Sequence, residues 1–297
     1  MRLLLTGAFK CSQEQLDMIR SLGYEITYIQ DERVSLDIDV SNIDTVVCNS
    51  LFLHNDIAKF KNLKFIQLTS AGLDRVPLDY IKEKGIKLFN ARGVYSVPMA
   101  EWVVLKILEI YKKSKHFYKN QNEHKWDKQR DLLELTDKTA AIIGFGSVGY
   151  EVAKRLKAFD VKVIGVGRRN IESDLLDEYY LIDDIDEVLK RSDIVVLTLP
   201  LTEKTKHFLD SDRIFSMKDN SVLVNVSRGG VIDEASLVEA IKNKKFLGLA
   251  LDVFEEEPLS TNSVLWDFDN VIITPHLSYL SDKINERLFE KIIDNLE

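Results

Sequence analysis

Cysteine, proline and long apolar runs are all scarce in this sequence. The two cysteines, Cys11 and Cys48, form no CxxC spacing and provide no disulfide framework, which favours a reducing cytoplasm. No apolar stretch reaches the length that spans a membrane, and the three leucines after Arg2 are too few for a signal peptide. Five prolines and 45% hydrophobic residues are typical of a globular chain.

Positive charge is also in deficit. The formal net charge of -8 and the pI near 5.3 argue against a nucleic-acid partner. No cluster of histidine and cysteine has zinc-ligand spacing, so we expect no metal. Four histidines are expected to be surface or packing residues: His54, His116, His124 and His207. The length of 297 residues favours two domains.

The first third of the sequence alternates strand-like and helix-like segments. Strands are expected at 3–6, 24–29, 44–48, 64–68 and 86–89, and Ser12 with Gln15 has the pattern of a capping box at a helix start. This pattern predicts a small α/β domain. From about Val97 the apolar residues recur at helical spacing without a glycine break, which predicts one long helix leaving that domain.

A second series of apolar strands follows, each separated by a helical pattern. The strands are expected at 139–143, 161–166, 193–199, 221–226, 246–253 and 270–274. This alternation predicts a doubly wound parallel sheet, a Rossmann nucleotide domain spanning 98–276. The smaller, flavodoxin-like α/β substrate domain would combine 1–97 with 277–297, which ends in an amphipathic helix with one apolar stripe: Ile284, Leu288, Ile292 and Leu296.

A glycine-rich loop follows the first strand of the second series. The segment GFGSVG places three glycines between a strand and a helix, at Gly144, Gly146 and Gly149. The three suit a tight turn, close approach of the backbone to a pyrophosphate, and close packing of helix on strand. The N–H groups of Ser147 and Val148 would meet the phosphates at the helix start.

Two arginines stand where a dinucleotide site usually has one acidic residue. The strand that ends at Val166 is followed by Gly167, Arg168 and Arg169, instead of a carboxylate for the ribose hydroxyls of NAD. An arginine fork can hold a 2′-phosphate, so the pattern favours NADP(H). The alternative is a solvated arginine pair beside an NAD(H) site.

Three later segments each place a functional side chain at the end of an expected strand: SVLVNVSRGG, LALDVFEEEPL and NVIITPHLS. Together with GFGSVG, SAGLD at 70–74 and NARGVYSVPMAEW at 90–102, this ordered series resembles the D-isomer-specific 2-hydroxyacid dehydrogenase family. The resemblance extends over nearly the whole chain. It implies a nicotinamide-dependent oxidoreductase acting on a small 2-keto or 2-hydroxy acid held between the two domains.

The resemblance assigns three catalytic residues, and their chemistry is consistent with the reaction. His276 would give a proton to the substrate oxygen during reduction and remove it in the reverse direction. Glu257, the last of three consecutive glutamates, would favour the imidazolium form of that histidine. Arg228 would bind the substrate carboxylate through a permanently charged fork. The alternatives are an arginine in a surface ion pair, a glutamate in an exposed acidic run and a histidine at a strand end.

The resemblance also implies residues that bind substrate and cofactor. Ser70, Ala71 and Gly72 would present backbone N–H groups to the substrate carboxylate. The cofactor would contact a further set of residues: Pro200, Thr205, Val226 and Asp252, the last two at the nicotinamide amide.

Departures from the family pattern affect the substrate pocket. Arg92 replaces a common proline, and residues 277–279 replace the usual small ones, so substrate size stays open. We expect glyoxylate or hydroxypyruvate reduction, with D-3-phosphoglycerate oxidation or a non-catalytic dinucleotide sensor as alternatives. A homodimer is expected, with the helix around 101–111 near its interface, although that apolar stripe could equally be intrachain core. The final helix ends early for the family, which predicts reduced packing on the first domain.

Overall fold

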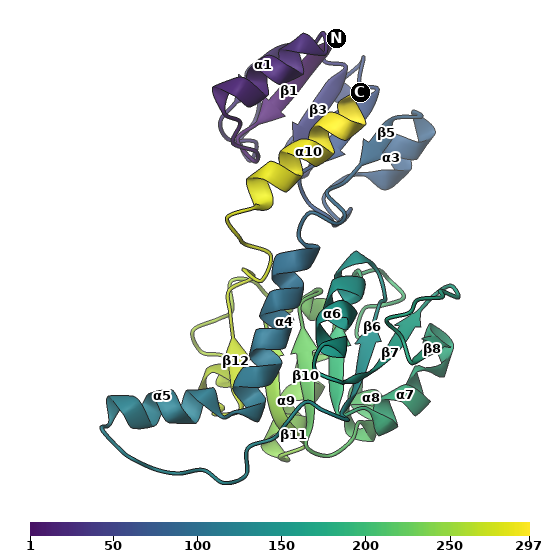
Figure 1. The fold of residues 1–297 in the computed structure, drawn as a ribbon. Helices are drawn as coiled ribbons and strands as arrows, with labels where there is room; N and C mark the ends of the chain where they lie inside the picture. Colours follow the sequence, from purple (N-terminus) through teal and green to yellow (C-terminus); the bar gives the residue numbers. More distant parts are fainter. The chain divides into compact units, whose positions relative to one another are not determined.

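The structure is a computed structural model that describes residues 1–297, and the chain divides into two compact units (Figure 1). Unit 1 comprises Met1–Tyr95 and Ser281–Glu297, and unit 2 comprises Ser96–Leu280. The boundaries predicted at 97 and 276 therefore lie close to the observed ones at 95 and 280. None of the helices has the length and apolar character needed to cross a membrane.

Unit 1 is built on a five-stranded parallel sheet in the order β2-β1-β3-β4-β5, the flavodoxin-like order. The strands are β1 (Arg2–Thr6), β2 (Glu25–Ile29), β3 (Thr45–Cys48), β4 (Phe65–Leu68) and β5 (Lys87–Phe89). The helices are α1 (Gln13–Ser21), α2 (Leu51–His54), α3 (Leu78–Glu83) and α10 (Ile284–Leu296), with a 3-10 turn η1 (Ile57–Lys59). The predicted capping box of Ser12 and Gln15 begins α1.

Alternate residues of each strand enter different cores, because successive side chains in a strand point to opposite faces. In β1, Leu4 packs on the face that also buries residues of α2 and α3. Its neighbours Leu3 and Leu5 pack on the opposite face with α1 and α10. The C-terminal helix buries three residues of its predicted stripe, Leu288, Ile292 and Leu296, so it packs on unit 1 through that stripe.

Unit 2 contains a seven-stranded parallel sheet in the order β12-β11-β10-β9-β6-β7-β8 (Figure 1). The strands are β6 (Thr139–Ile143), β7 (Lys162–Gly167), β8 (Glu178–Leu181), β9 (Ile194–Leu197), β10 (Ser221–Asn225), β11 (Phe246–Leu251) and β12 (Val271–Ile273). The α-helices are α4 (Ser96–Tyr111), α5 (Ser114–Asn122), α6 (Ser147–Lys157), α7 (Ile185–Arg191), α8 (Ser211–Ser216) and α9 (Glu234–Lys242). Three 3-10 turns complete the unit: η2 (Ile182–Asp184), η3 (Gly229–Val231) and η4 (Val264–Asp267).

The sheet of unit 2 is covered on both faces, as predicted for a doubly wound fold. One core joins α4 and α6 to strand residues such as Ile142 and Val196. The other joins α7, α8 and α9 to residues such as Ile143 and Leu197. The strand order changes direction between β6 and β9, and this switch point is where α/β sheets bind ligands at the carboxyl ends of their strands.

Two details of unit 2 differ from the sequence prediction. The single long helix expected from Val97 is two helices, because Lys113 adopts a left-handed conformation with φ 52° between α4 and α5. Strand β8 was not predicted, since its four residues, EYYL, are only partly buried and do not form the apolar run that marks the other strands of this sheet. It pairs with β7 at the edge of the sheet.

We expect that the substitution Ile292→Ala destabilises unit 1. The side chain is fully buried in α10, and its truncation leaves a cavity that costs about 2–5 kcal/mol. Urea unfolding followed by far-UV circular dichroism measures the change. The exposed neighbour Glu290→Ala should stay within about 0.5 kcal/mol, and equal losses in both variants would contradict the assigned packing.

Candidate active site

The glycine loop lies at the switch point of the unit 2 sheet and brings two strand ends close together. Gly144 follows β6 with φ +97°, and a Cβ there would lie 2.8 Å from the backbone nitrogen of Leu199, which follows β9. A Cβ on Gly149 would lie 2.9 Å from the Ile142 side chain, so this glycine permits α6 to pack on β6. Gly144 is therefore required by its backbone conformation, and Gly149 by the packing of helix on strand.

The third glycine leaves room for a ligand. A Cβ on Gly146 would meet only one atom within 4 Å, the Gly144 carbonyl oxygen at 3.7 Å. Gly146 is also the N-cap of α6 and supplies no side-chain hydrogen bond. The first N–H groups of this helix, on Ser147 and Val148, therefore remain available for an anion. This open, uncapped helix start fits a dinucleotide pyrophosphate.

Arg168 and Arg169 follow β7 directly, and both side chains are exposed. The Tyr179 hydroxyl donates to the Arg169 carbonyl oxygen at 2.6 Å, which fixes the backbone of the turn while the guanidinium groups remain outside. No carboxylate forms an ion pair with either arginine. The pair therefore offers positive charge at the strand end where a dinucleotide fold holds the ribose.

The turn after β9 carries Pro200 and Thr205. The Thr205 hydroxyl donates to the Pro200 carbonyl oxygen at 2.6 Å and accepts from the Thr202 N–H at 2.8 Å. Thr205 therefore shapes the turn, whatever contact it makes with a cofactor. Val226 directly follows the next strand, β10. The residue is buried, and its backbone N–H donates to the Leu197 carbonyl oxygen at 3.4 Å.

Arg228 lies on the loop after β10, and a buried asparagine shapes that loop. The Asn225 side chain donates to the Arg228 carbonyl oxygen at 3.1 Å and accepts from the Ser227 N–H at 3.0 Å. One terminal nitrogen of the arginine donates to the Ser227 carbonyl oxygen at 2.8 Å. Sequence analysis missed this role of Asn225, although its place as the last residue of a buried strand indicates a polar contact with the loop.

The predicted pairing of His276 with Glu257 is present. Nδ1 of the imidazole lies 2.8 Å from Oε2 of Glu257, and the other carboxylate oxygen accepts the Phe254 N–H at 3.1 Å. Because an ionised carboxylate can only accept hydrogen bonds, Nδ1 carries a proton and Nε2 is left for a substrate. Both side chains are partly exposed, so a small molecule can reach them. Roles in catalysis stay predictions.

The loop that carries His276 is held by Asp252, at the end of β11. Oδ1 of this fully buried carboxylate accepts from the Thr274 hydroxyl at 2.5 Å and from the Leu277 N–H at 2.9 Å. Oδ2 accepts from the Ser278 N–H at 2.9 Å, and the Asp252 carbonyl oxygen accepts from the His276 N–H at 2.8 Å. The side-chain bonds of Asp252 all go to the loop that carries the histidine, and its N–H donates to the Asn225 carbonyl oxygen at 3.1 Å. Its predicted contact with the nicotinamide stays a prediction.

In unit 1, the predicted substrate loop also lies at the carboxyl edge of a parallel sheet. Ser70, Ala71 and Gly72 follow β4, and the Asn90 side chain from the loop after β5 donates to the Ala71 carbonyl oxygen at 2.7 Å. The backbone N–H groups of Ala71 and Gly72 make no hydrogen bond in the structure. They are therefore available to an anion, and their contact with a substrate carboxylate stays a prediction.

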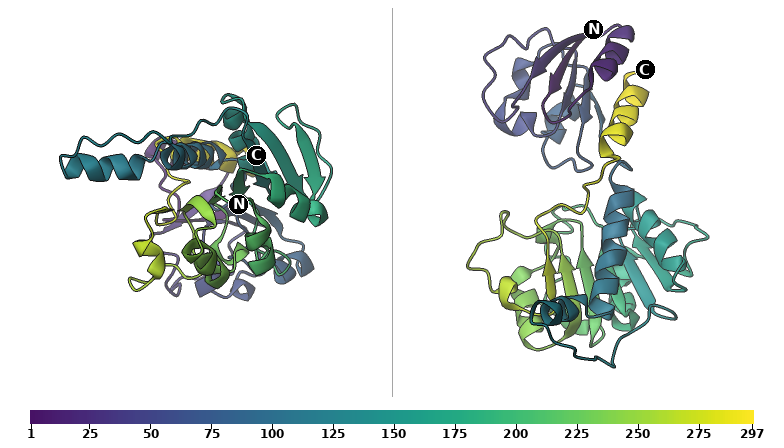
Figure 2. Two further views of the ribbon diagram at one scale, coloured as in Figure 1. Left: turned by 90° about the horizontal axis from the view of Figure 1, so that it is seen from below. Right: turned by 60° about the vertical axis from the view of Figure 1, so that its left-hand side comes forward.

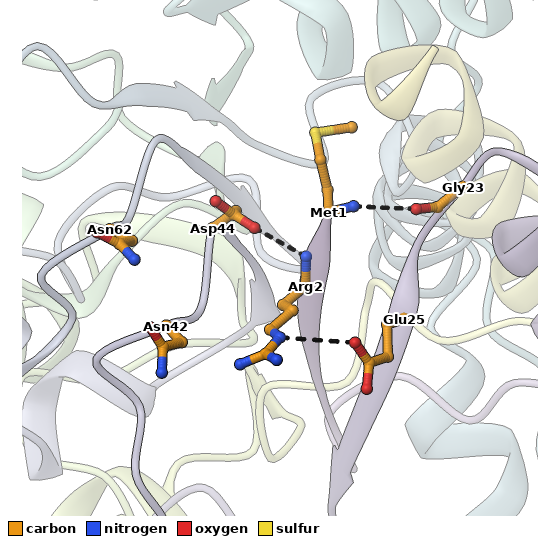
Figure 3. A pocket seen from close by; sticks show the side chains of 7 residues that line it. All are labelled: Met1, Arg2, Gly23, Glu25, Asn42, Asp44 and Asn62. Atoms are coloured by element: carbon orange, nitrogen blue, oxygen red, sulfur yellow. Dashed lines mark hydrogen bonds and ion pairs between the residues drawn. The ribbon is translucent and has the colours of Figure 1, made fainter.

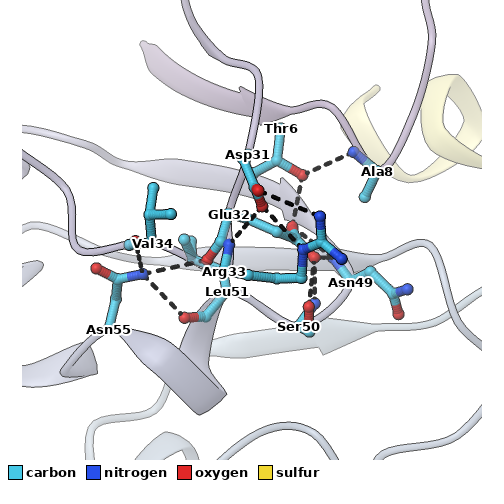
Figure 4. A network of polar contacts seen from close by, with 10 residues as sticks. All are labelled: Thr6, Ala8, Asp31, Glu32, Arg33, Val34, Asn49, Ser50, Leu51 and Asn55. Carbon is cyan, nitrogen blue, oxygen red and sulfur yellow. Dashed lines mark hydrogen bonds and ion pairs between the residues drawn. The ribbon is translucent and has the colours of Figure 1, made fainter.

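A buried carboxylate that sequence analysis missed holds the same edge of unit 1 together (Figure 4). Glu32 accepts from the Thr6 hydroxyl at 2.6 Å and from the backbone N–H groups of Asn49 and Ser50 at 3.0 and 2.5 Å. It thereby ties the ends of β1 and β3 together. The Asn49 side chain then accepts from Arg75, three residues after the substrate loop, at 2.9 Å.

The opposite edge of the unit 1 sheet contains an open hollow of about 610 Å³ (Figure 3). Met1, Arg2, Glu25 and Asp44 line it at the amino ends of the strands. Its charged groups bond one another, as in the Arg2–Glu25 ion pair at 3.5 Å. Ligands in parallel α/β sheets bind at the carboxyl ends, so we assign no function to this hollow.

Comparisons with known proteins agree with this geometry. The family model described as D-isomer specific 2-hydroxyacid dehydrogenase, NAD binding domain, matches residues 104–278. A hydroxypyruvate reductase of Thermotoga maritima is 37% identical over 240 residues, which are 80% of this chain and 77% of that protein. A D-3-phosphoglycerate dehydrogenase of Methanocaldococcus jannaschii is 39% identical over 74% of this chain, but the match spans only 42% of that longer protein.

A solved structure extends the likeness over both units. The D-lactate dehydrogenase of Aquifex aeolicus, complexed with NAD and lactic acid, is 28% identical with a TM-score of 0.79 and covers 99% of this chain and 96% of its own. The matched family model, the relatives and the geometry of residues 228, 257 and 276 support one conclusion. The chain belongs to the D-isomer-specific 2-hydroxyacid dehydrogenase family and is an oxidoreductase that uses a nicotinamide cofactor.

Proposed function

We propose that the protein reduces small 2-keto acids of the glyoxylate and hydroxypyruvate class to D-2-hydroxy acids. The observation that carries the proposal is the 2.8 Å contact between His276 and Glu257, on strand ends next to the loop that holds Arg228. A positioned proton donor and a fixed positive charge are what carbonyl reduction of a keto acid requires.

Each side chain has a separate task in this reaction. The nicotinamide, when bound, supplies the hydride. Arg228 binds the substrate carboxylate and orients the keto group, and Nε2 of His276 donates the proton to the carbonyl oxygen. Glu257 accepts from Nδ1 at 2.8 Å, which fixes the orientation of the ring and leaves Nε2 to face the substrate. In the direction of oxidation, neutral His276 removes the hydroxyl proton.

The similar hydroxypyruvate reductase and a glyoxylate reductase of Thermofilum pendens, 35% identical over 79% of this chain, support the substrate class. Oxidation of D-3-phosphoglycerate is the alternative, supported by the relative from Methanocaldococcus jannaschii. A dinucleotide sensor without activity would need no paired proton donor, so the contact of His276 with Glu257 favours an enzyme.

A panel of 2-keto acids tests the proposal. We expect that NAD(P)H absorbance falls with glyoxylate or hydroxypyruvate, and that Arg228→Ala and His276→Ala each lower kcat/KM by about 10²-fold or more. The control Lys190→Gln, an exposed residue on α7, should leave the rate unchanged. Cofactor binding without turnover of any keto acid would favour the dinucleotide sensor. Turnover only of D-3-phosphoglycerate or its keto acid would favour the phosphoglycerate dehydrogenase.

For the cofactor, we propose a preference for NADP(H) over NAD(H). Two exposed guanidinium groups follow β7 without a carboxylate partner, and an unpaired arginine fork favours a 2′-phosphate over bare ribose hydroxyls. Relatives of this fold are known with either cofactor, such as the structures in complex with NADPH and with NAD.

The double substitution of Arg168 and Arg169 by glutamine should change cofactor choice. Each charge-assisted bond to the phosphate contributes about 1.5–3 kcal/mol, so kcat/KM for NADPH should fall by at least about tenfold. The value for NADH should change by less than about twofold. Steady-state kinetics with both cofactors measures the ratio, and a wild-type preference for NADH would refute the assignment.

We further propose a homodimer that forms through α5 and residues 123–134. Figures 1 and 2 show α5 and the extended segment after it projecting from the rest of unit 2. Trp126 on this arm is 93% exposed, while Lys125 N–H bonds the Asn120 carbonyl oxygen at 2.8 Å and Asp127 pairs with His116 at 3.3 Å. A large aromatic side chain held in place and left in water is typical of an interface anchor.

The predicted helix around 101–111 packs largely within its own unit. Most apolar residues of α4 belong to the core of unit 2, including Val103 and Ile107, and only Leu105 among the large ones is half-exposed. This burial supports the alternative of intrachain core for the stripe, and a place near the interface stays a prediction. A cytoplasmic location remains a proposal, supported by two free cysteines.

The variant Trp126→Ala should weaken the dimer. Loss of a buried aromatic anchor costs about 2 kcal/mol or more, which raises the dissociation constant at least about 30-fold. Sedimentation velocity over a range of concentrations gives the constant. Trp266→Ala is the matched control, because that tryptophan is 50% exposed elsewhere in unit 2. Equal dissociation constants for both variants would show that α5 and residues 123–134 do not form the interface.

A further inference from the structure

A second histidine–carboxylate pair lies beside the first one in unit 2. Nε2 of His207 is 2.7 Å from Oε1 of Glu255, the first residue of the acidic run that ends in Glu257. His207 follows the turn of Pro200 and Thr205, so this pair joins the loop after β9 to the loop after β11. This contact was not predicted, because 48 positions separate the two residues and His207 was expected to be a surface or packing residue.

The backbone segments around this pair are in direct contact with one another. The His207 N–H donates to the Gly230 carbonyl oxygen at 2.8 Å, and residues 209 and 232 form a parallel bridge. A Cβ on Gly229 would lie 1.8 Å from the Phe254 carbonyl carbon, so only glycine permits this approach. The loop of Arg228 is therefore enclosed between the two loops that the His207–Glu255 pair connects.

A further carboxylate, that of Glu234, lies beside the acidic run of residues 255–257. The Glu234 side chain accepts the Glu255 N–H at 3.3 Å from the start of α9. Burial raises the pKa of Glu234, and the charges of Glu255 and Glu256 raise it further. Four carboxylates at 234 and 255–257 thus surround the turn, and the histidines that contact them are His207 and His276.

We propose that His207 is a positioning residue that, by holding Glu255, leaves Glu257 as the carboxylate that orients His276. With Glu255 fixed on His207, the Phe254 N–H meets Oε1 of Glu257 at 3.1 Å and Oε2 faces the imidazole. Without the pair, repulsion among the carboxylates displaces the turn, and three neighbouring glutamates compete for His276. The inference rests on the proposed reduction of 2-keto acids.

Substitutions at both ends of the pair test it in the full-length enzyme. His207 has φ 48°, so His207→Asn keeps a residue that tolerates the left-handed backbone but is too short to reach Glu255. We expect kcat with glyoxylate or hydroxypyruvate to fall about five- to tenfold, with the dissociation constant of the cofactor within about twofold of wild type. His207→Gln retains a donor of similar reach and should recover most of the rate.

Glu255→Ala provides a second variant that does not touch the left-handed residue. It should lower kcat by a similar factor, and the double variant with His207→Asn should be no slower than either single one, because the pair acts as a unit. Glu256→Ala removes the adjacent charge, which forms no ion pair, and serves as the matched control with an unchanged kcat.

The pH dependence of kcat separates positioning from general damage. His207→Asn leaves the Glu255 charge uncompensated, which favours the His276 imidazolium and moves the alkaline limb to higher pH. Glu255→Ala removes that charge and moves the limb to lower pH. The other titratable groups around His276 are Glu257, the buried Asp252 and Tyr279, whose ring centroid lies 6.1 Å from that of the histidine, and all remain in both variants.

Opposite shifts with equal losses of kcat support the proposal. Wild-type kcat in both variants, additive losses, or a failure of His207→Gln to recover activity would overturn it. Turnover by the wild-type enzyme is measured before the variants are compared, and its absence would refute the proposed function instead.

Discussion

The active-site loop depends on one buried carboxylate. Asp252 is fully buried, and its two oxygens accept three hydrogen bonds from residues 274–278. A buried charge is stable only if hydrogen bonds replace its water, so the loop must return to this point and adopt one conformation. His276 consequently adopts φ 50°, and its ring faces Glu257. The hydrogen bonds that Asp252 accepts thus determine where His276, the proposed proton donor, lies.

Parallel topology explains how residues distant in sequence form one site. The strands β6, β9, β10, β11 and β12 lie side by side, so the loops after them share one edge of the sheet. The glycine loop, Arg228, Glu257 and His276 all occupy these loops. Close approach of neighbouring loops then requires residues without side chains, and Gly144 and Gly229 supply them where a Cβ would collide with backbone atoms.

Local patterns predicted the fold, and the family resemblance assigned the proposed catalytic residues, but most contacts between distant segments were not predicted. Apolar runs and glycine spacing identified eleven of the strands, as well as the turn of Gly144. The break at Lys113 was not predictable, because neither glycine nor proline marks it. Asp252 was predicted at the site, yet its partners lie 22 to 26 residues later, and no local pattern indicates that they use both of its oxygens. Glu32 and His207 were missed for the same reason.

The start of α6 shows how the fold provides for a cofactor. Helices α1, α8 and α9 begin with side-chain caps from Ser12, Asp210 and Asp233, whereas the Gly146 cap of α6 has no side chain to donate or accept. A side-chain cap stabilises a helix by about 1 kcal/mol, and α6 lacks this contribution. A carboxylate cap would occupy the position of the pyrophosphate and repel it. The same glycine that weakens the isolated helix therefore keeps its N–H groups and its dipole available to the dinucleotide.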